Sequence, residues 1–223
     1  MKKNILAIGT HPDDIEIGCG GTIRLLADQG HVIKFVVVTS GDEGSLFLDK
    51  EHLQKIRKSE AVKSAHILGA SEVLFFDEPD GLDHVTNKSK LNLIHIVRDF
   101  KPEIVFIHSS YDQFSDHQIV SQFSQSAIQA ASGPWYRDAG LTPHCVCNVF
   151  GFEVWNPIQA PQMTINIENS MDRKIEALSC HTSQTDHLNY VGAIRGFNEY
   201  RGMISMSGKY AESFEVIRKS SII

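Results

Sequence analysis

Three ionisable side chains crowd into four positions near the N-terminus, in the stretch AIGTHPDDIEIGCGGTIRLL. His11, Asp13 and Asp14 follow an apolar run and precede a segment with the pattern of a helix. A second polar stretch, HSSYDQFSDH, follows another apolar run and supplies more residues of the same two types: Asp112, Asp116 and His117. Imidazole and carboxylate groups bind zinc, with iron, manganese or cobalt as alternatives. The two stretches therefore indicate a metal site, provided that the fold brings them together.

Three protein ligands with one open position form the usual arrangement around a catalytic zinc ion. We expect His11, Asp14 and His117 to supply two nitrogen ligands and one oxygen ligand to one ion per chain. Pro12 stiffens the loop, so His11 and Asp14 can face one point while Asp13 points elsewhere. An unligated carboxylate beside a metal suits the general base of a hydrolase. The alternative is that HPDD only starts a helix, with an aspartate accepting hydrogen bonds from its free amides.

The glycines of GCGG (18–21) raise another alternative, a dinucleotide-binding turn at a helix N-terminus. Such a turn follows its strand directly, whereas these glycines begin nine residues after the predicted strand ends. They lie inside the predicted helix, so we expect them to allow this helix to pack closely on the sheet.

Strands and helices alternate over the first 131 residues. The predicted strands are 4–9, 32–39, 73–77 and 103–108. The predicted helices are 17–29, a charged segment ending at Gly69, 89–100 and 117–131. This alternation predicts an α/β fold, a three-layer α-β-α arrangement with a mostly parallel, Rossmann-like sheet. Ligands bind such sheets beyond the carboxyl ends of the strands, and the first and fourth strands are typically neighbours. The two polar stretches should therefore meet.

The pattern becomes less regular after Gly133. Further strands are predicted at 145–155, 163–167 and 213–218, and a helix at 170–181. The rest of the C-terminal part carries no clear pattern. No repeat, low-complexity segment or linker divides the chain, so we expect a single domain over residues 1–223.

Composition excludes several classes of function. The formal net charge is −6 and no run of lysine or arginine occurs, which argues against a nucleic-acid-binding protein. No stretch approaches the roughly 20 apolar residues of a membrane span. The apolar run at the N-terminus is too short for an export signal, so a cytoplasmic location is expected. The apolar stretch NVFGFEVW (148–155) could contribute to a homo-oligomer interface.

The stretch HPDDIEIGCGG resembles the signature of the PIG-L (LmbE-like) family of zinc-dependent N-deacetylases. Other stretches resemble further family blocks in the family's order: TSGDEG (39–44), RKSEAVKSAHILGA (57–70), DQFSDHQ (112–118), FEVW (152–155), KIEALSCHTSQ (174–184) and YAESF (210–214). The resemblance implies that His11, Asp14 and His117 bind the metal and that Asp13 is the catalytic base. Family members use zinc-bound water to remove the acetyl group from the nitrogen of an amino sugar. The implied substrate is a small N-acetylglucosamine-type conjugate.

One position departs from the family pattern. Many members carry a histidine three positions before the last metal ligand, where it stabilises the oxyanion or protonates the amine. This chain has Phe114 there, which can donate neither a proton nor a hydrogen bond. His181 and Tyr111 are candidate substitutes, although His181 could instead bind the last carbonyl groups of a helix.

Three further residues are candidates for supporting roles. Asp112 and Asp116 could orient His117 and other site groups, or serve only as a turn residue and a helix cap. Arg57 could bind a hydroxyl or phosphate group of the substrate. Its spacing from Glu60 is equally compatible with a surface ion pair.

Two other functions compete with deacetylation. The first is a metal-dependent hydratase or lyase that adds water to an unsaturated carboxylic acid, a reaction that needs no protonated amine leaving group. Phe114 favours this alternative, and clustered arginines in the pocket would support it. The second is a non-catalytic metal- or sugar-binding protein, against which the unligated Asp13 argues.

Overall fold

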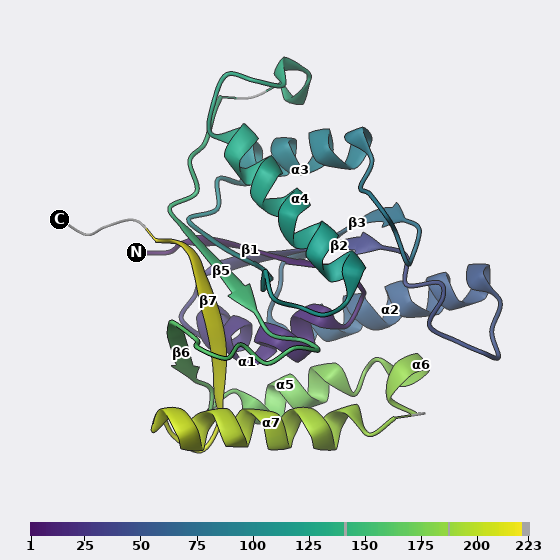
Figure 1. Cartoon of the computed structure of the whole chain (residues 1–223), viewed down its shortest axis with the longest axis vertical. Helices are drawn as coiled ribbons and strands as arrows, with labels where there is room; N and C mark the ends of the chain where they lie inside the picture. The colour runs from purple at the N-terminus through teal and green to yellow at the C-terminus, as the bar shows by residue number, and fades with distance from the viewer. Residues whose placement is uncertain (141, 187, 220–223) are drawn as a thin grey trace.

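The computed structural model describes residues 1–140, 142–186 and 188–219. Over these residues, seven strands form one mixed sheet in the order β3-β2-β1-β4-β5-β7-β6 (Figure 1). The strands are β1 (Asn4–Gly9), β2 (Val32–Thr39), β3 (Glu72–Glu78), β4 (Ile104–His108), β5 (Asn148–Phe152), β6 (Met163–Asn166) and β7 (Ala211–Lys219). The predicted α/β class is confirmed.

The first five strands are parallel, and β1 lies between β2 and β4. Ile5 of β1 pairs with Ile33 on one side and with Ile104 on the other. Strand β7 runs antiparallel to both β5 and β6. The sheet is therefore mostly parallel, as predicted, and the ends of β1 and β4 open at the same edge.

Helices cover both faces of the sheet (Figure 1). One face carries α3 (Asn87–Phe100) and α4 (Ser115–Ala131). The other face carries α1 (Asp14–Asp28), α2 (Lys50–Leu68), α5 (Met171–Leu178) and α7 (Tyr190–Ser205). The short helices η1 (Arg137–Ala139) and α6 (Thr182–Thr185) lie in connections. None of the helices in the described part of the chain is long and apolar enough to cross a membrane.

Strand β1 shows why the sheet is buried on both faces. Successive side chains of a strand point to opposite faces. Leu6 and Ile8 belong to a core with residues of α3 and α4, among them Val97 and Val120. Ile5 and Ala7 belong to a second core with residues of α1 and α2, among them Ile15 and Leu68. A continuous apolar strand sequence is the result.

The glycines of α1 allow close packing, as predicted from their place inside the helix. A Cβ atom on Gly18 would lie 2.2 Å from a ring carbon of Phe152 in β5. A Cβ atom on Gly21 would lie 2.7 Å from the side chain of Ile167. Residues with side chains would hold α1 away from the sheet and displace the loop in front of it.

Several helix assignments differ from the prediction: α3 and α4 begin two residues earlier, the helix predicted at 170–181 ends at Leu178, and α6 was not predicted. Helix α1 begins at Asp14 rather than Ile17, because its first turn is acidic and the apolar periodicity starts later. Helix α7 was not predicted, because its sequence YVGAIRGFNEYRGMIS mixes glycines with apolar residues on several faces. It packs against β7 and supplies Tyr190 to the pocket that also contains His11 and Asp116.

Candidate active site

The two polar stretches meet at the carboxyl ends of β1 and β4. His11 follows β1, Asp14 opens α1, and His117 lies in the first turn of α4. His11 Nδ1 is 3.1 Å from His117 Nε2 and 3.4 Å from Asp14 Oδ2. His117 Nε2 is 3.6 Å from the same oxygen of Asp14. Two nitrogens and one oxygen, from the loop after β1, from α1 and from α4, thus form a compact triangle.

This triangle fits a zinc ion. Tetrahedral zinc with bonds of about 2.0–2.1 Å separates its ligand atoms by about 3.3 Å. The three donor atoms have this spacing before any ion is considered, and the side chains of Asp14 and His117 are buried. His11 is 15% exposed, so the triangle faces solvent on one side. Donor chemistry and spacing both suit a three-ligand site with an open position.

Carboxylates surround the nitrogens of the imidazoles that face away from the triangle. His11 Nε2 lies 2.9 Å from Asp80 and 3.0 Å from Asp116. His117 Nδ1 lies 3.4 Å from Asp112, which also accepts a hydrogen bond from the Phe114 amide at 3.0 Å. Such partners fix the tautomer and the orientation of a metal-binding imidazole. Asp80 has no role in the prediction from sequence, because nothing near it in the chain indicates a metal.

His108, the first residue of the second polar stretch, is a further residue of the site. It ends β4 and is fully buried, with its ring 4.1 Å from that of His117 between centroids. Its Nε2 accepts a hydrogen bond from the Thr10 amide at 2.9 Å and lies 3.3 Å from Asp14 Oδ2. Burial, aided by His117, lowers the pKa of His108. A neutral ring therefore backs the carboxylate of Asp14, and the place of His108 at the start of the second polar stretch was the available signal.

Burial and neighbouring charges shift the pKa values of the three donor side chains in opposite directions. Burial alone would raise the pKa of Asp14, but His117, His108 and His11 lower it well below its ordinary value. Burial alone would lower the pKa of His11 and His117, but Asp14 and the other carboxylates raise both. The cluster therefore favours an ionised carboxylate at Asp14 and protonated imidazoles at His11 and His117, whose protons a bound metal would displace.

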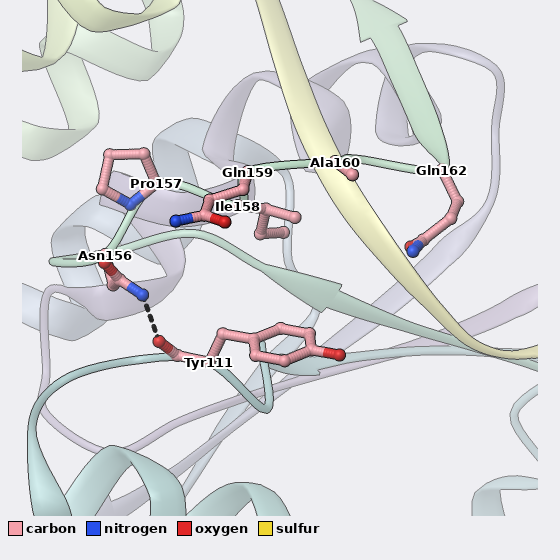
Figure 2. A pocket seen from close by; sticks show the side chains of 7 residues that line it. All are labelled: Tyr111, Asn156, Pro157, Ile158, Gln159, Ala160 and Gln162. Carbon is pink, nitrogen blue, oxygen red and sulfur yellow. Dashed lines mark hydrogen bonds between the residues drawn. The ribbon is translucent and has the colours of Figure 1, made fainter.

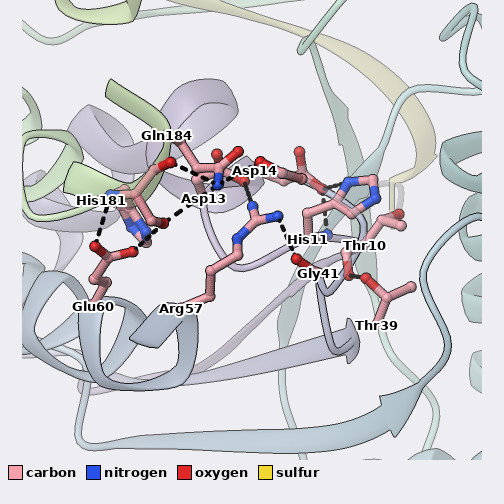
Figure 3. A network of polar contacts seen from close by, with 12 residues as sticks. Thr10, His11, Asp13, Asp14, Thr39, Gly41, Arg57, Glu60, His181 and Gln184 are labelled. Atoms are coloured by element: carbon pink, nitrogen blue, oxygen red, sulfur yellow. Dashed lines mark hydrogen bonds and ion pairs between the residues drawn. The ribbon is translucent and has the colours of Figure 1, made fainter. Parts of the chain in front are cut away.

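Asp13 is held by an arginine and is not used as a helix cap. It occupies the N-cap position of α1, but its side chain accepts no capping hydrogen bond. Arg57 Nη2 donates to Asp13 Oδ1 at 2.8 Å, and Nη1 donates to the carbonyl of Gly41 at 3.0 Å (Figure 3). The side chains of Asp13 and Arg57 are 10% and 4% exposed. The capping alternative for Asp13 does not hold, which leaves its carboxylate directed to Arg57 and the pocket.

Glu60 forms no surface ion pair with Arg57, so that alternative is wrong. The carboxylate of Glu60 is buried and accepts hydrogen bonds from the Thr182 hydroxyl and the Ser183 amide, both at 2.9 Å. Helix α2 therefore positions both Asp13 and the segment that begins at Thr182. Arg57 holds Asp13, and Glu60 holds the segment that brings Gln184 to the pocket (Figure 3).

The structure does not bring His181 or Tyr111 into the pocket. His181 is fully buried, with Nε2 3.5 Å from Glu16. Burial lowers the pKa of His181, but Glu16 and Asp13 raise it overall. Tyr111 lines a neighbouring cavity of about 390 Å³, where its carbonyl accepts a hydrogen bond from Asn156 (Figure 2). Neither side chain is placed to substitute for the histidine absent at position 114.

The pocket over the donor triangle has a volume of about 400 Å³. One wall is aromatic: the rings of Phe114 and Tyr190 each lie 5.7 Å from the ring of Trp155. Carboxylates line much of the rest, namely Asp13, Asp14, Glu43, Asp80 and Asp116. Arg57 is the one lysine or arginine among the lining residues that the structure describes, and it is already paired with Asp13. The pocket is therefore acidic.

Comparison with known proteins identifies relatives of this chain. The PIG-L family model, described as GlcNAc-PI de-N-acetylase, matches residues 6–128. The diacetylchitobiose deacetylase of Thermococcus kodakarensis is 29% identical over 191 residues, which span 82% of this chain and 70% of the relative.

Two solved structures resemble the whole fold. The 4-carboxy-2-hydroxymuconate hydratase of Pseudomonas putida has a TM-score of 0.90 at 25% identity, covering 100% of this chain and 99% of that one. The N,N'-diacetylchitobiose deacetylase of Pyrococcus horikoshii has a TM-score of 0.86 at 25% identity, covering 96% of this chain and 84% of that one. The predicted enzyme class, a hydrolytic N-deacetylase, is confirmed by the deacetylase relatives. Because the family model matches more than half of the chain, this protein belongs to the PIG-L family.

Proposed function

We propose that the protein removes the acetyl group from the nitrogen of an N-acetylglucosamine-type conjugate, with Asp13 as general base. The observation that carries this proposal is the charge of the pocket around Asp13. Its carboxylates suit the hydroxyl groups of a neutral sugar, which donate hydrogen bonds, and the amine that hydrolysis releases, which becomes a cation. Deacetylase relatives of the same family support the reaction class.

His11, Asp14 and His117 would hold the metal ion of this reaction. The donor set and its spacing favour zinc, with iron(II), manganese or cobalt as alternatives. A divalent ion there supplies Lewis-acid chemistry, which polarises an amide carbonyl and makes water a better nucleophile. Asp80, Asp112 and Asp116 orient the two imidazoles.

Asp13 moves the protons of the reaction. Arg57 occupies Oδ1 of Asp13, so Oδ2 accepts the proton of the attacking water. The same oxygen then returns that proton to the sugar nitrogen as the carbon–nitrogen bond breaks, which releases acetate and a free amine. Arg57 acts by fixing the carboxylate, and a substrate contact for this arginine would have to share its guanidinium with Asp13 and Gly41.

Tyr190 supplies the hydrogen bond that Phe114 cannot donate. Its ring lies against Trp155 on the aromatic wall of the pocket. Burial and the nearby Asp13 raise the pKa of Tyr190, so its hydroxyl stays protonated and can donate to the carbonyl oxygen as negative charge develops there. Gln184 is less suitable, because its amide already donates to the carbonyl of Gly44 at 3.3 Å.

A hydratase acting on an unsaturated carboxylic acid is the second candidate. The TM-score of 0.90 to a hydratase, over nearly the full length of both chains, favours it, as does Phe114. The pocket opposes it, since a di- or tricarboxylate needs free cations, and the one arginine that lines the described pocket is already paired. Because of this charge, we rank deacetylation first.

The test compares both reactions on the same protein. Zinc-loaded wild type is incubated with a panel of N-acetylglucosamine conjugates, and free amine and acetate are quantified together. Asp13→Asn is run beside it, with zinc content measured to show that the site is still loaded. Equal release of amine and acetate by the wild type, reduced about 10²-fold or more in the variant, supports the proposal. Hydration of unsaturated di- or tricarboxylates, with no amine released from any sugar, contradicts it.

A further inference from the structure

An exposed apolar segment borders the active-site pocket. Leu46, Phe47 and Leu48 lie between β2 and α2 and are 95%, 80% and 42% exposed. Contiguous exposed apolar side chains of this kind cost solubility and are usually kept for binding. Neither the metal site nor the proposed acid–base chemistry uses them.

Hydrogen bonds shape this segment and connect it to α2. The hydroxyl of Ser45 accepts hydrogen bonds from the amides of Phe47 and Leu48, at 3.1 and 3.2 Å. Asp49 caps α2 by accepting from the amide of His52 at 3.0 Å. The backbone is therefore held in a turn that leaves the apolar side chains on the surface.

Phe47 and Leu48 of this segment line a second cavity, which adjoins the active-site pocket. This cavity has a volume of about 310 Å³ and is lined by Phe47 and Leu48 together with Ile56 of α2. Its remaining lining residues are polar: Ser45, Thr182, Ser183 and Asp186. We call Leu46, Phe47, Leu48 and Ile56 the apolar ledge; Leu46 is its most exposed member.

Two short chain segments separate the cavity from the active-site pocket. Gly44 lines the pocket and Ser45 lines the cavity; likewise Gln184 lines the pocket and Ser183 lines the cavity. The hydrogen bond from Gln184 to the carbonyl of Gly44 joins these segments. A ligand that extends out of the pocket over this bond meets the apolar ledge next.

We propose that the apolar ledge binds an uncharged alkyl or aryl aglycone of the substrate. This inference rests on the proposed function, because the sugar must occupy the pocket for its aglycone to reach the ledge. The carboxylates and aromatic wall of the pocket receive the sugar, and the ledge receives the apolar group attached to it. The adjoining cavity removes that group from water, which stabilises the bound state.

Paired substrates test the ledge. N-acetylglucosamine and its octyl glycoside, kept below the micelle concentration, are given to wild type and to the double variant Leu46→Ser/Phe47→Ser. We expect the wild type to have a kcat/KM about 10-fold or more higher for the octyl glycoside. The double variant should lose this preference and keep its activity on the free sugar. Met203→Ser is the control, because Met203 is 68% exposed on α7, which contributes nothing to the second cavity.

Three results would overturn the inference. Wild type showing no preference, or the double variant keeping it, excludes the ledge as a binding site. A change from oligomer to monomer in the double variant, with the preference intact, assigns the ledge to contact with a second copy of the chain. A separate measurement tests the ledge independently of catalysis: calorimetry gives the affinity of wild type and of the double variant for octyl glucoside. Tighter binding to wild type without release of amine from either sugar supports the ledge and contradicts the proposed function.

Discussion

At the scale of single residues, the site depends on carboxylates that contact the imidazole of His11. Asp80 and Asp116 both contact Nε2 of His11, and Asp80 also accepts a hydrogen bond from the Glu43 amide at 3.3 Å. Asp80 therefore joins the imidazole of His11 to the loop that leads to the apolar ledge. Asp80 should therefore affect both the zinc affinity of the protein and the rate of the reaction.

Replacing Asp80 by asparagine should weaken zinc binding about 10- to 100-fold, because the imidazole of His11 loses a charged partner. Zinc affinity is measured by competition with a chromogenic chelator. Asp83→Asn is the matched control: Asp83 lies in the same loop, and its side chain is 93% exposed. Equal zinc affinities for the two variants would show that Asp80 does not support the metal site.

Replacing Tyr190 by phenylalanine should lower kcat about 100-fold with little change in KM, because the lost hydrogen bond forms mainly as charge develops on the carbonyl oxygen. Adding Phe114→His to this variant should restore part of the rate, since it returns a donor to the same wall of the pocket. Steady-state kinetics on one N-acetylated sugar measure both effects. A KM effect alone would make Tyr190 a binding residue.

The His181–Glu16 contact should make stability depend on pH. The folded protein raises the pKa of His181, mainly through Glu16, so the charged ring is favoured in the folded state. This contribution is fully present below the unfolded pKa of about 6.5 and is lost as pH rises through the higher folded pKa.

The free energy of unfolding of wild type should therefore exceed that of His181→Gln most at low pH, and the difference should shrink as pH rises. Urea unfolding across this range measures it. The control is His52→Gln, since the His52 side chain is 72% exposed. A difference that does not vary with pH would assign His181 a packing role only.

At the scale of elements, helix α1 is positioned by glycine. Gly18 lies against Phe152, and a Cβ atom added there would be only 2.2 Å from the ring, so no side chain fits without movement. The same helix opens with Asp14, so a shift of α1 would also disturb the donor triangle. Packing and function are therefore coupled at this helix.

Gly18→Ala should destabilise the protein by about 1–3 kcal/mol, the usual cost of overpacking. Gly196→Ala in α7 is the matched control, because nothing lies within 4 Å of its Cβ position. There, alanine should stabilise by about 0.5–1 kcal/mol through its helix propensity. Thermal unfolding of both variants measures the contrast, and equal shifts of the same sign would argue against close packing at Gly18.

At the scale of the whole molecule, a metal bound by His11 of the loop after β1, Asp14 of α1 and His117 of α4 should stabilise the fold. Metal bound only to the folded state adds about 4 kcal/mol when its free concentration is a thousandfold above Kd. For a chain of this size, the melting temperature should rise by roughly 10 °C. Calorimetry with and without chelator measures this rise, and His11→Ala should abolish it. An unchanged wild-type melting temperature would contradict a metal site in this cluster.

Several properties of the whole molecule stay predictions. A single domain over residues 1–223, a homo-oligomer and a cytoplasmic location were expected from the sequence. The nucleic-acid and membrane-span exclusions rest on charge and hydropathy. The fold class and the family, by contrast, are confirmed.

The sequence by itself determined the mostly parallel character of the sheet, the meeting of β1 with β4, and the candidate ligands His11, Asp14 and His117. It could do so because strand periodicity is local and parallel strands present their carboxyl ends at one edge. Tertiary structure alone decided that Arg57 pairs with Asp13, that Asp80 and Tyr190 reach the pocket, and that Tyr111 and His181 do not. Asp80 and Tyr190 lie outside every motif that the sequence analysis quotes. For the others, the paths of loops and the depth of helix packing decide which side chains converge.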